Sequence, residues 1–295
     1  MIGSKSLILL LVSQKAVPKV DTVSDVMTRW VVTIPPSDSL LQARDSMTHN
    51  RVSQLVVVDH RGRPIGLISK RDMARFLLED STTRPLQEIM VSEATSKSIP
   101  TIMPDFPVFN AARMFDTENL SYAVVTGEQP LSGIMTETDL CHYFSQKWPG
   151  KFKVRDLASG DFIFAKSTYP VVHVAQAIVY RQPSIPVIDE ELVGILTLWD
   201  LLSIRERVPG AKHGRLFGSK RENEMALIRT GDLMTRNPIT TLADADLAQA
   251  AQIIITKGIG SLPVLDNERK VVGLLTKHDI VKALGRIGSS ATMEG

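Results

Sequence analysis

The sequence predicts an α/β fold, of the α+β type, built from four copies of one unit. A stretch at 273–279, Gly-Leu-Leu-Thr-Lys-His-Asp, follows an apolar β-branched run and precedes residues with helical spacing. The same pattern of Gly, two apolar residues, Ser or Thr, and Asp three positions later ends at Asp72, Asp139, Asp200 and Asp279. The intervals are 67, 61 and 79 residues (139−72, 200−139 and 279−200). This recurrence indicates a repeat protein in which each unit is strand, helix, strand, strand, helix.

Repeat 1, residues 23–78, shows how each element is predicted. Two consecutive prolines end a short β-branched strand at 30–34. Asp38 or Ser39 can cap the next helix, which carries apolar residues at helical spacing and ends at Asn50. A turn at 59–63 that contains glycine joins hairpin strands at 55–58 and 65–69, and a helix at 72–78 closes the unit.

The same order is expected in repeats 2 (85–144), 3 (154–204) and 4 (230–284). The predicted elements are 108–118, 122–125 and 131–136 in repeat 2, 162–165, 172–180, 185–188 and 192–197 in repeat 3, and the helix 247–256 in repeat 4. Gly258 and Gly260 should end that last helix. The remaining segments are an N-terminal extension (1–22), a turn-rich linker (145–153), a basic insert (205–229) and a small polar tail (285–295) that we expect to fray.

The composition is that of an ordinary globular protein, and its small net charge produces no strong electrostatic field over the whole molecule. The 295 residues are 43% hydrophobic and 22% charged, with net charge +2. Cys141 is the single cysteine, which excludes an intrachain disulfide and a thiolate metal cluster, and we expect a cytoplasmic protein. An apolar run at 7–12 is too short to cross a membrane, so we expect it to pack on repeat 1 as a strand or helical turn.

The repeated stretch has the chemistry of a ribose-phosphate site. The Ser or Thr hydroxyl and the free N–H groups of the helix start can bind an anion, and the helix dipole assists. An Asp three residues on can accept hydrogen bonds from a diol. A ribose 5′-phosphate would satisfy both, whereas the alternative interpretation of one copy alone is a plain helix cap with an acidic first turn.

Further motifs resemble the cystathionine-β-synthase (CBS) domain family. They are the Ser-x-Pro-Val strands at 184–189 and 261–266 and the openings Asp-Val-Met-Thr and Asp-Leu-Met-Thr, which end at Thr28 and Thr235. Four repeats in one chain are similar to the γ subunit of AMP-activated protein kinase. The resemblance implies two modules of paired repeats, 23–144 and 154–284, which we expect to associate as a flat disc. It also implies clefts for AMP, ADP or ATP, with S-adenosylmethionine ranked lower.

The resemblance assigns a ribose-phosphate edge and a base pocket to each cleft. The Asp72 and Asp279 clefts rank first because cations stand beside each Asp, whereas Asp139 has Glu137 nearby. Asp200 ranks third, with Trp199 either stacking on a ligand or packed in the core. The predicted ligand-binding residues are Ser69, Lys70, Arg71, Asp72, Ser96, Ile99, Ser121, Phe162, Ala165, Ser184, Thr197, Asp200, Thr276, Lys277, His278 and Asp279.

The leading hypothesis is a stand-alone regulatory protein that binds an adenine nucleotide and signals to an unidentified protein partner, with further homodimerisation through exposed helix faces. The alternative is a nucleic-acid-binding regulator that uses the basic insert, in which Lys212, Arg215, Lys220 and Arg221 could contact phosphates. A solvated basic loop is the simpler interpretation of that insert. No metal site, no membrane segment and no enzymatic activity are expected, because the known catalytic motifs are absent and the six histidines lack ligand spacing.

Overall fold

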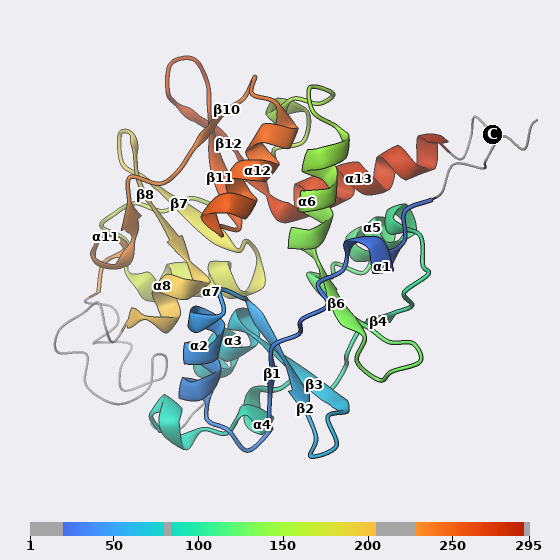
Figure 1. Cartoon of the computed structure of the whole chain (residues 1–295). Coiled ribbons are helices and arrows are strands. Elements are labelled where there is room, and N and C mark those ends of the chain that lie inside the picture. Colours follow the sequence, from blue (N-terminus) through green and yellow to red (C-terminus); the bar gives the residue numbers. More distant parts are fainter. Residues whose placement is uncertain (1–19, 80–83, 205–227, 292–295) are drawn as a thin grey trace, which may run out of the picture.

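The computed structural model describes residues 20–79, 84–204 and 228–291 (Figure 1). Within them, four three-stranded sheets and their flanking helices confirm the predicted fold class. The N-terminal run at 7–12 and most of the basic insert, including 212–221, lie outside the described residues.

Repeats 1 and 2 follow the predicted order of elements. Repeat 1 comprises β1 (Thr33–Ile34), α2 (Leu40–His49), β2 (Gln54–Val58), β3 (Pro64–Ser69) and α3 (Lys70–Glu79). Repeat 2 comprises β4 (Thr101–Ile102), α5 (Val108–Thr117), β5 (Tyr122–Val125), β6 (Gly133–Thr136) and α6 (Glu137–Lys147). In each sheet the first strand pairs parallel with the second, and the second pairs antiparallel with the third.

Repeats 3 and 4 form the other half of the chain. Repeat 3 comprises α7 (Val171–Tyr180), β7 (Ser184–Ile188), β8 (Leu192–Thr197) and α8 (Leu198–Leu202). Repeat 4 comprises β10 (Thr241–Leu242), α12 (Leu247–Lys257), β11 (Ser261–Leu265), β12 (Val271–Thr276) and α13 (Lys277–Ala291). As predicted, Ser39 caps α2, where it accepts a hydrogen bond from the Gln42 N–H at 3.2 Å, and Gly258 ends α12 at φ +63°.

The strand predicted at 162–165 in repeat 3 is wrong. Only Ala165 forms a bridge, parallel to Val187. The Gln182 side chain accepts from the Ile163 N–H and donates to the Ile163 C=O, both at 2.8 Å, so it satisfies backbone groups that a strand would pair. The third strand of this sheet is instead β9 (Thr235–Arg236), which belongs to the opening of repeat 4.

The opening segment of each repeat pairs with the neighbouring repeat. These segments contain α1 (Val23–Val26), η1 (Leu86–Glu88) with α4 (Val91–Ala94), η2 (Val154–Asp156) and α11 (Thr230–Leu233). Backbone bridges join Thr28 to Ile134, Ser96 to Leu67 and Ser159 to Leu274, and β9 joins Thr235 to Ile195. Repeats 1 and 2 therefore exchange their openings, and so do repeats 3 and 4.

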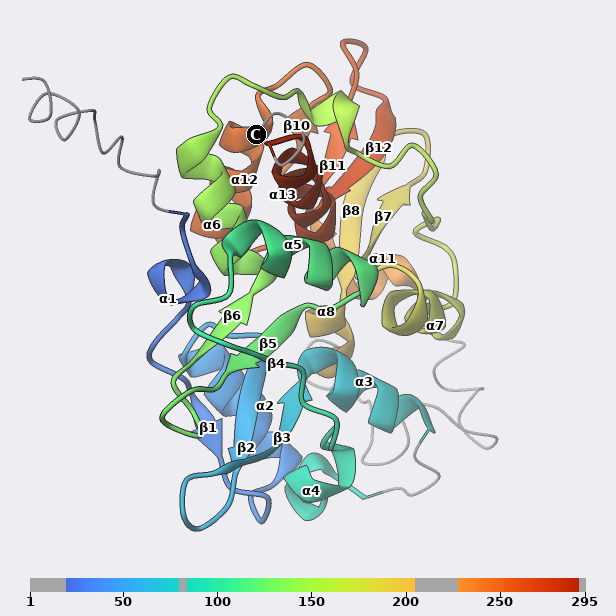
Figure 2. The ribbon, with the colours of Figure 1, turned by 90° about the vertical axis from the view of Figure 1, so that its right-hand side faces the viewer.

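The main hydrophobic clusters cross between the two halves of the chain. One cluster combines buried residues of repeats 1 and 3 with those of the openings of repeats 2 and 4, and the other combines buried residues of repeats 2 and 4 with those of the openings of repeats 1 and 3. Helix α13 lies along α5 and α6, and α3 packs against α7 and α8 (Figures 1 and 2). A smaller cluster, containing Val56, Leu67, Val124 and Ile134, joins the sheets of repeats 1 and 2. Burial therefore ties each repeat to two others.

The expectation that residues 285–295 form a frayed tail is wrong for 285–291, because α13 continues to Ala291. Gly285 lies against α5, where a Cβ atom would stand 3.2 Å from Arg113 Cγ and 3.4 Å from Arg113 Cα. The two helices approach closely at this glycine, and packing extends the helix beyond what its small polar sequence suggests.

Candidate functional site

Each of the four motif aspartates closes a reciprocal helix cap. In repeat 4, the Thr276 N–H and hydroxyl donate to Asp279 Oδ2 at 2.8 and 2.7 Å. The Asp279 N–H donates back to the Thr276 hydroxyl at 3.3 Å. Ser69 with Asp72, Thr136 with Asp139 and Thr197 with Asp200 make the same Oδ2 contacts, at 2.5–2.9 Å. The cap thus uses the hydroxyl and one carboxylate oxygen, and leaves Oδ1 for another partner.

In two of the repeats, the second carboxylate oxygen of the motif aspartate, Oδ1, accepts a hydrogen bond from a threonine of an opening segment. Thr28 donates to Asp139 Oδ1 at 2.8 Å, and Thr235 donates to Asp200 Oδ1 at 3.3 Å. Each Thr comes from the other repeat of the pair and ends the Met-Thr opening. Both roles are absent from the sequence-based list of site residues, although the Met-Thr motif marks them.

The hydroxyls at the corresponding positions near Asp72 and Asp279 donate to backbone carbonyls instead of to the carboxylates. Ser96, which pairs with Leu67 as Thr28 pairs with Ile134, donates to the Ser98 carbonyl at 3.2 Å. Ser159, in the same place beside Leu274, donates to the Asp161 carbonyl at 2.8 Å. Among the described residues no hydroxyl donates to Oδ1 of Asp72 or Asp279, so these two carboxylates differ from the other two.

Two basic residues of α3 have contacts near the repeat 1 motif. Arg75 Nη1 lies 3.7 Å from Asp72 Oδ1, and Lys70 Nζ lies 4.8 Å from the centre of the Trp199 ring. Burial lowers the pKa of Lys70, and the charge of Lys277 lowers it further. Lys70 and Lys277 therefore approach each other from repeats 1 and 4. Trp199 is only half-buried and offers its face to a cation, which neither interpretation of this residue anticipated.

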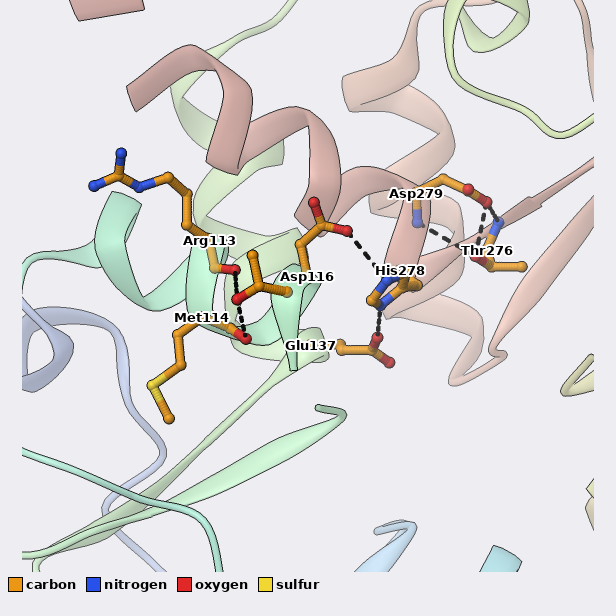
Figure 3. A network of polar contacts seen from close by, with 8 residues as sticks. Arg113, Met114, Asp116, Glu137, Thr276, His278 and Asp279 are labelled. Carbon is orange, nitrogen blue, oxygen red and sulfur yellow. Dashed lines mark hydrogen bonds and ion pairs between the residues drawn. The ribbon is translucent and has the colours of Figure 1, made fainter. Parts of the chain in front are cut away.

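The two residues that precede Asp279, Lys277 and His278, both contact repeat 2, and Figure 3 shows His278 between Glu137 and Asp116. Lys277 Nζ donates to the Thr138 hydroxyl at 2.8 Å. His278 lies between two carboxylates, with Nδ1 3.0 Å from Glu137 Oε1 and Nε2 3.5 Å from Asp116 Oδ1. The hydrogen bond to Glu137 raises the pKa of His278, against an opposing effect of burial.

Burial also changes the acidity of two motif aspartates and of Tyr122. Desolvation raises the pKa of both Asp139 and Asp279, although their threonine caps oppose the shift. Burial, with the nearby Asp72 charge, raises the pKa of Tyr122 to about 12. Tyr122 therefore lies close to Asp72 from repeat 2, a neighbour that the sequence-based list misses.

The residues predicted for the base pocket of repeats 1 and 2 do not all lie together. Ser96 lies beside β3, and Ile99 packs on the cluster between the sheets of repeats 1 and 2. The Ser121 carbonyl, by contrast, accepts from the Glu137 N–H at 3.2 Å, at the start of α6.

In the second pair of repeats, the Ser184 hydroxyl meets the Ser261 hydroxyl at 2.5 Å, and Ala165 is buried. The Phe162 ring centroid lies 6.4 Å from that of Phe164, which is half exposed.

Other candidate sites in the described part of the chain are few. A pocket of about 530 Å³ lies beside the start of the repeat 3 motif, where Arg236 pairs with Gly194, and Ser167, Asp189, Arg229 and Asp232 also line it. The described residues contain no group of three or more His, Cys, Asp or Glu side chains suited to a metal ion. Nor does any helix among them have the length and apolarity needed to span a membrane.

Four strand–helix repeats exchange their openings in pairs, and each has a capped strand–helix junction with an aspartate, so the protein is built of paired α/β repeat domains. The chain belongs to the CBS domain family, whose model matches residues 23–79, 91–146, 154–207 and 231–286. The resemblance found in the motifs is thereby confirmed.

Two relatives span nearly the whole chain. MJ1225 of Methanocaldococcus jannaschii is 26% identical over 269 residues, which are 85% of this chain and 94% of that protein. Its crystal structure, described as a proposed archaeal homologue of γ-AMPK, covers 89% of this chain and 99% of that one, with a TM-score of 0.75 and 23% identity. An uncharacterised conserved protein from Pyrococcus horikoshii covers 90% and 100%, with a TM-score of 0.61 and 19% identity.

The CBS protein PAE2072 from Pyrobaculum aerophilum was solved with AMP. It covers 41% of this chain and 91% of that one, at 23% identity and a TM-score of 0.37. At that similarity its ligand carries no argument for this chain.

Proposed function

We propose that this protein is a regulatory sensor that binds adenine nucleotides in the clefts beside Asp72 and Asp279, and that signals ligand occupancy to a partner protein. The observation that carries the proposal is the difference between the four carboxylates. Thr28 and Thr235 already donate to Oδ1 of Asp139 and Asp200. Oδ1 of Asp72 and of Asp279 receives no such hydroxyl in the described residues, so each can accept the hydroxyls of a ribose.

The surroundings of these two carboxylates suit a 5′-phosphate. Each lies on the first turn of a helix, α3 or α13, whose N-terminal N–H groups and dipole favour an anion. Lys70 and Lys277 follow the capping residues directly and approach each other. A phosphate between them would relieve the repulsion of two partly buried cations.

The location of the clefts supports regulation. Ser69 and Thr276 end strands that contact the opening segment of the paired repeat, while α3 and α13 pack on the other half of the chain. A nucleotide in either cleft would touch elements from different repeats and would favour one arrangement of them. No described group of side chains suggests chemistry on the nucleotide itself.

The test compares two double variants by isothermal titration with AMP and with ATP. Asp72→Ala with Asp279→Ala removes the two carboxylates whose Oδ1 receives no hydroxyl in the described residues, and Asp139→Ala with Asp200→Ala is the matched control. All four substitutions remove the carboxylate half of the helix cap, at a cost of about 1 kcal/mol each. Asp139→Ala and Asp200→Ala also remove the contacts of Thr28 and Thr235, so the control is destabilised at least as much as the first variant.

The first variant should lose nucleotide binding and most of the ligand-induced rise in melting temperature, whereas the control should keep both. Full binding by the first variant, or equal losses in the two, would contradict the proposal.

A further inference from the structure

The two proposed nucleotide clefts face different repeats. Helix α3, which begins the Asp72 cleft, packs on α7 and α8 of repeat 3. Helix α13, which begins the Asp279 cleft, packs on α5 and α6 of repeat 2. The two arrangements correspond element by element, so residues at the same position of α5 and α7, or of α6 and α8, can be compared directly.

Two of these positions are acidic on one side and apolar on the other. The first residue of α6 is Glu137, and the first residue of α8 is Leu198. The penultimate residue of α5 is Asp116, and that of α7 is Val179. Leu198 and Val179 belong to the hydrophobic packing of repeats 1 and 3.

Both acidic residues contact His278, the residue that precedes Asp279 on the first turn of α13. They hold His278 at 3.0 and 3.5 Å, and their side chains are only 16% and 32% exposed. Because water screens such groups incompletely, their charge acts on an anion bound at the start of α13. His278 faces repeat 2 in this network rather than standing free as a phosphate ligand (Figure 3).

The cations beside Asp72 are not neutralised in this way. Lys70 lies over the Trp199 ring, and Arg71 forms no ion pair among the described residues. Lys70, Arg71 and Arg75 thus stand against the single carboxylate of Asp72.

Around Asp279 the balance is different. Lys277, Lys282 and His278 stand against Asp279, Glu137 and Asp116, and these charges sum to zero even when His278 is counted as protonated. The Asp72 cleft is therefore more positive by two charges, and Glu137 and Asp116 account for the difference.

We infer that the two clefts select ligands of different charge: the Asp72 cleft prefers a nucleoside di- or triphosphate, and the Asp279 cleft prefers a nucleoside monophosphate. Glu137 and Asp116 are the residues that set this specificity, because they repel phosphates beyond the first. The inference rests on the proposed function and adds to it that the two clefts differ in the ligand they prefer. The protein would then respond to the ratio of two nucleotides rather than to the amount of one.

The experiment measures each cleft separately in the full-length chain. Asp279→Ala leaves the Asp72 cleft, and Asp72→Ala leaves the Asp279 cleft. Titration of each variant with AMP and with ATP gives two dissociation constants and hence one preference ratio per cleft. The ratios should differ by at least tenfold, the size expected for one unit charge about 10 Å away in a partly buried site.

Charge exchange then tests the named residues. In the Asp72→Ala background, Glu137→Gln with Asp116→Asn should strengthen ATP binding about tenfold and change AMP binding much less. In the Asp279→Ala background, Leu198→Glu should weaken ATP binding by a similar factor, and Leu198→Gln controls for the loss of the apolar side chain. Thermal unfolding checks that every variant is folded, and single Glu137→Gln replaces the double variant if that one is not.

The outcomes separate the two ideas. Absence of AMP and ATP binding at both clefts overturns the proposed function itself. Binding at both clefts with the same preference ratio leaves that function standing and overturns the charge selection. Unequal ratios that do not respond to Glu137→Gln or to Leu198→Glu also overturn it, since another feature must then discriminate.

Discussion

Replacement of Gly285 by valine tests the close approach of α13 and α5, which joins repeat 4 to repeat 2. A Cβ atom at this position would lie 3.2 Å from Arg113 Cγ, 3.4 Å from its Cα and 3.4 Å from its N. The side-chain atom can move, but the two backbone atoms cannot. A single methyl group should therefore fit after a small adjustment, whereas the two further methyl groups of valine should not.

The magnitude follows from two opposing effects. Overpacking at a helix contact costs about 1–3 kcal/mol. Valine is better than glycine within a helix by a few tenths of a kcal/mol, which offsets little of that cost. For a chain of this size the net loss should lower the melting temperature by roughly 2–7 °C. Gly285→Ala should stay near the wild-type value, because alanine gains about 1 kcal/mol of helix propensity.

The assay is thermal unfolding followed by circular dichroism, with Gly260→Val as the matched control. A Cβ at Gly260 meets nothing within 4 Å, so that variant should unfold close to the wild type. Equal melting temperatures for Gly285→Val and Gly260→Val, or a rise for Gly285→Val, would refute the close packing of α13 on α5.

Two further predictions concern titratable groups. The pKa of His278 is raised above its unfolded value of 6.5, so the protonated side chain stabilises the fold at pH below that value, and the stabilisation is lost as pH rises through the folded pKa. The melting temperature should therefore fall between pH 6 and pH 8, less steeply in Glu137→Gln, and identical slopes would argue against the contact. The raised pKa values of Asp139 and Asp279 change stability in the same direction, so the comparison with Glu137→Gln, which removes the His278 contact, isolates the contribution of His278. Cys141 is fully buried and burial raises its pKa, so an aromatic disulfide reagent should label it only on unfolding; rapid labelling of the folded chain would contradict that burial.

Much of the fold could be predicted because local signals agreed with tertiary packing. The helices after Ser39 and before Gly258 begin and end where their caps indicated. The sequence failed where long-range contacts decide. No local sequence pattern predicts that the Gln182 side chain pairs with the backbone of Ile163. Nor does any predict that packing against α5 lets α13 continue past Gly285.

Within the site, only the motif aspartates and their capping hydroxyls could be predicted from the sequence. The spacing of the motif located each Asp and its capping hydroxyl, because both lie on one helical turn. The partners of Oδ1 come from another repeat, about a hundred residues away for Thr28 and Asp139. The orientation of His278 toward Glu137 and Asp116 likewise depends on how the halves meet, which periodicity does not encode.

The exchange of opening segments imposes a rule of parity on chains of this kind. Thr28 contacts the sheet of repeat 2, and Ser96 contacts that of repeat 1. The same reciprocity holds between Ser159 and Thr235 in the other pair. A chain with three such repeats would have one opening without a sheet and one sheet without an opening, unless a second copy supplied them. Growth by duplication should therefore proceed two repeats at a time, and the inheritable unit is the pair rather than the repeat that the sequence displays.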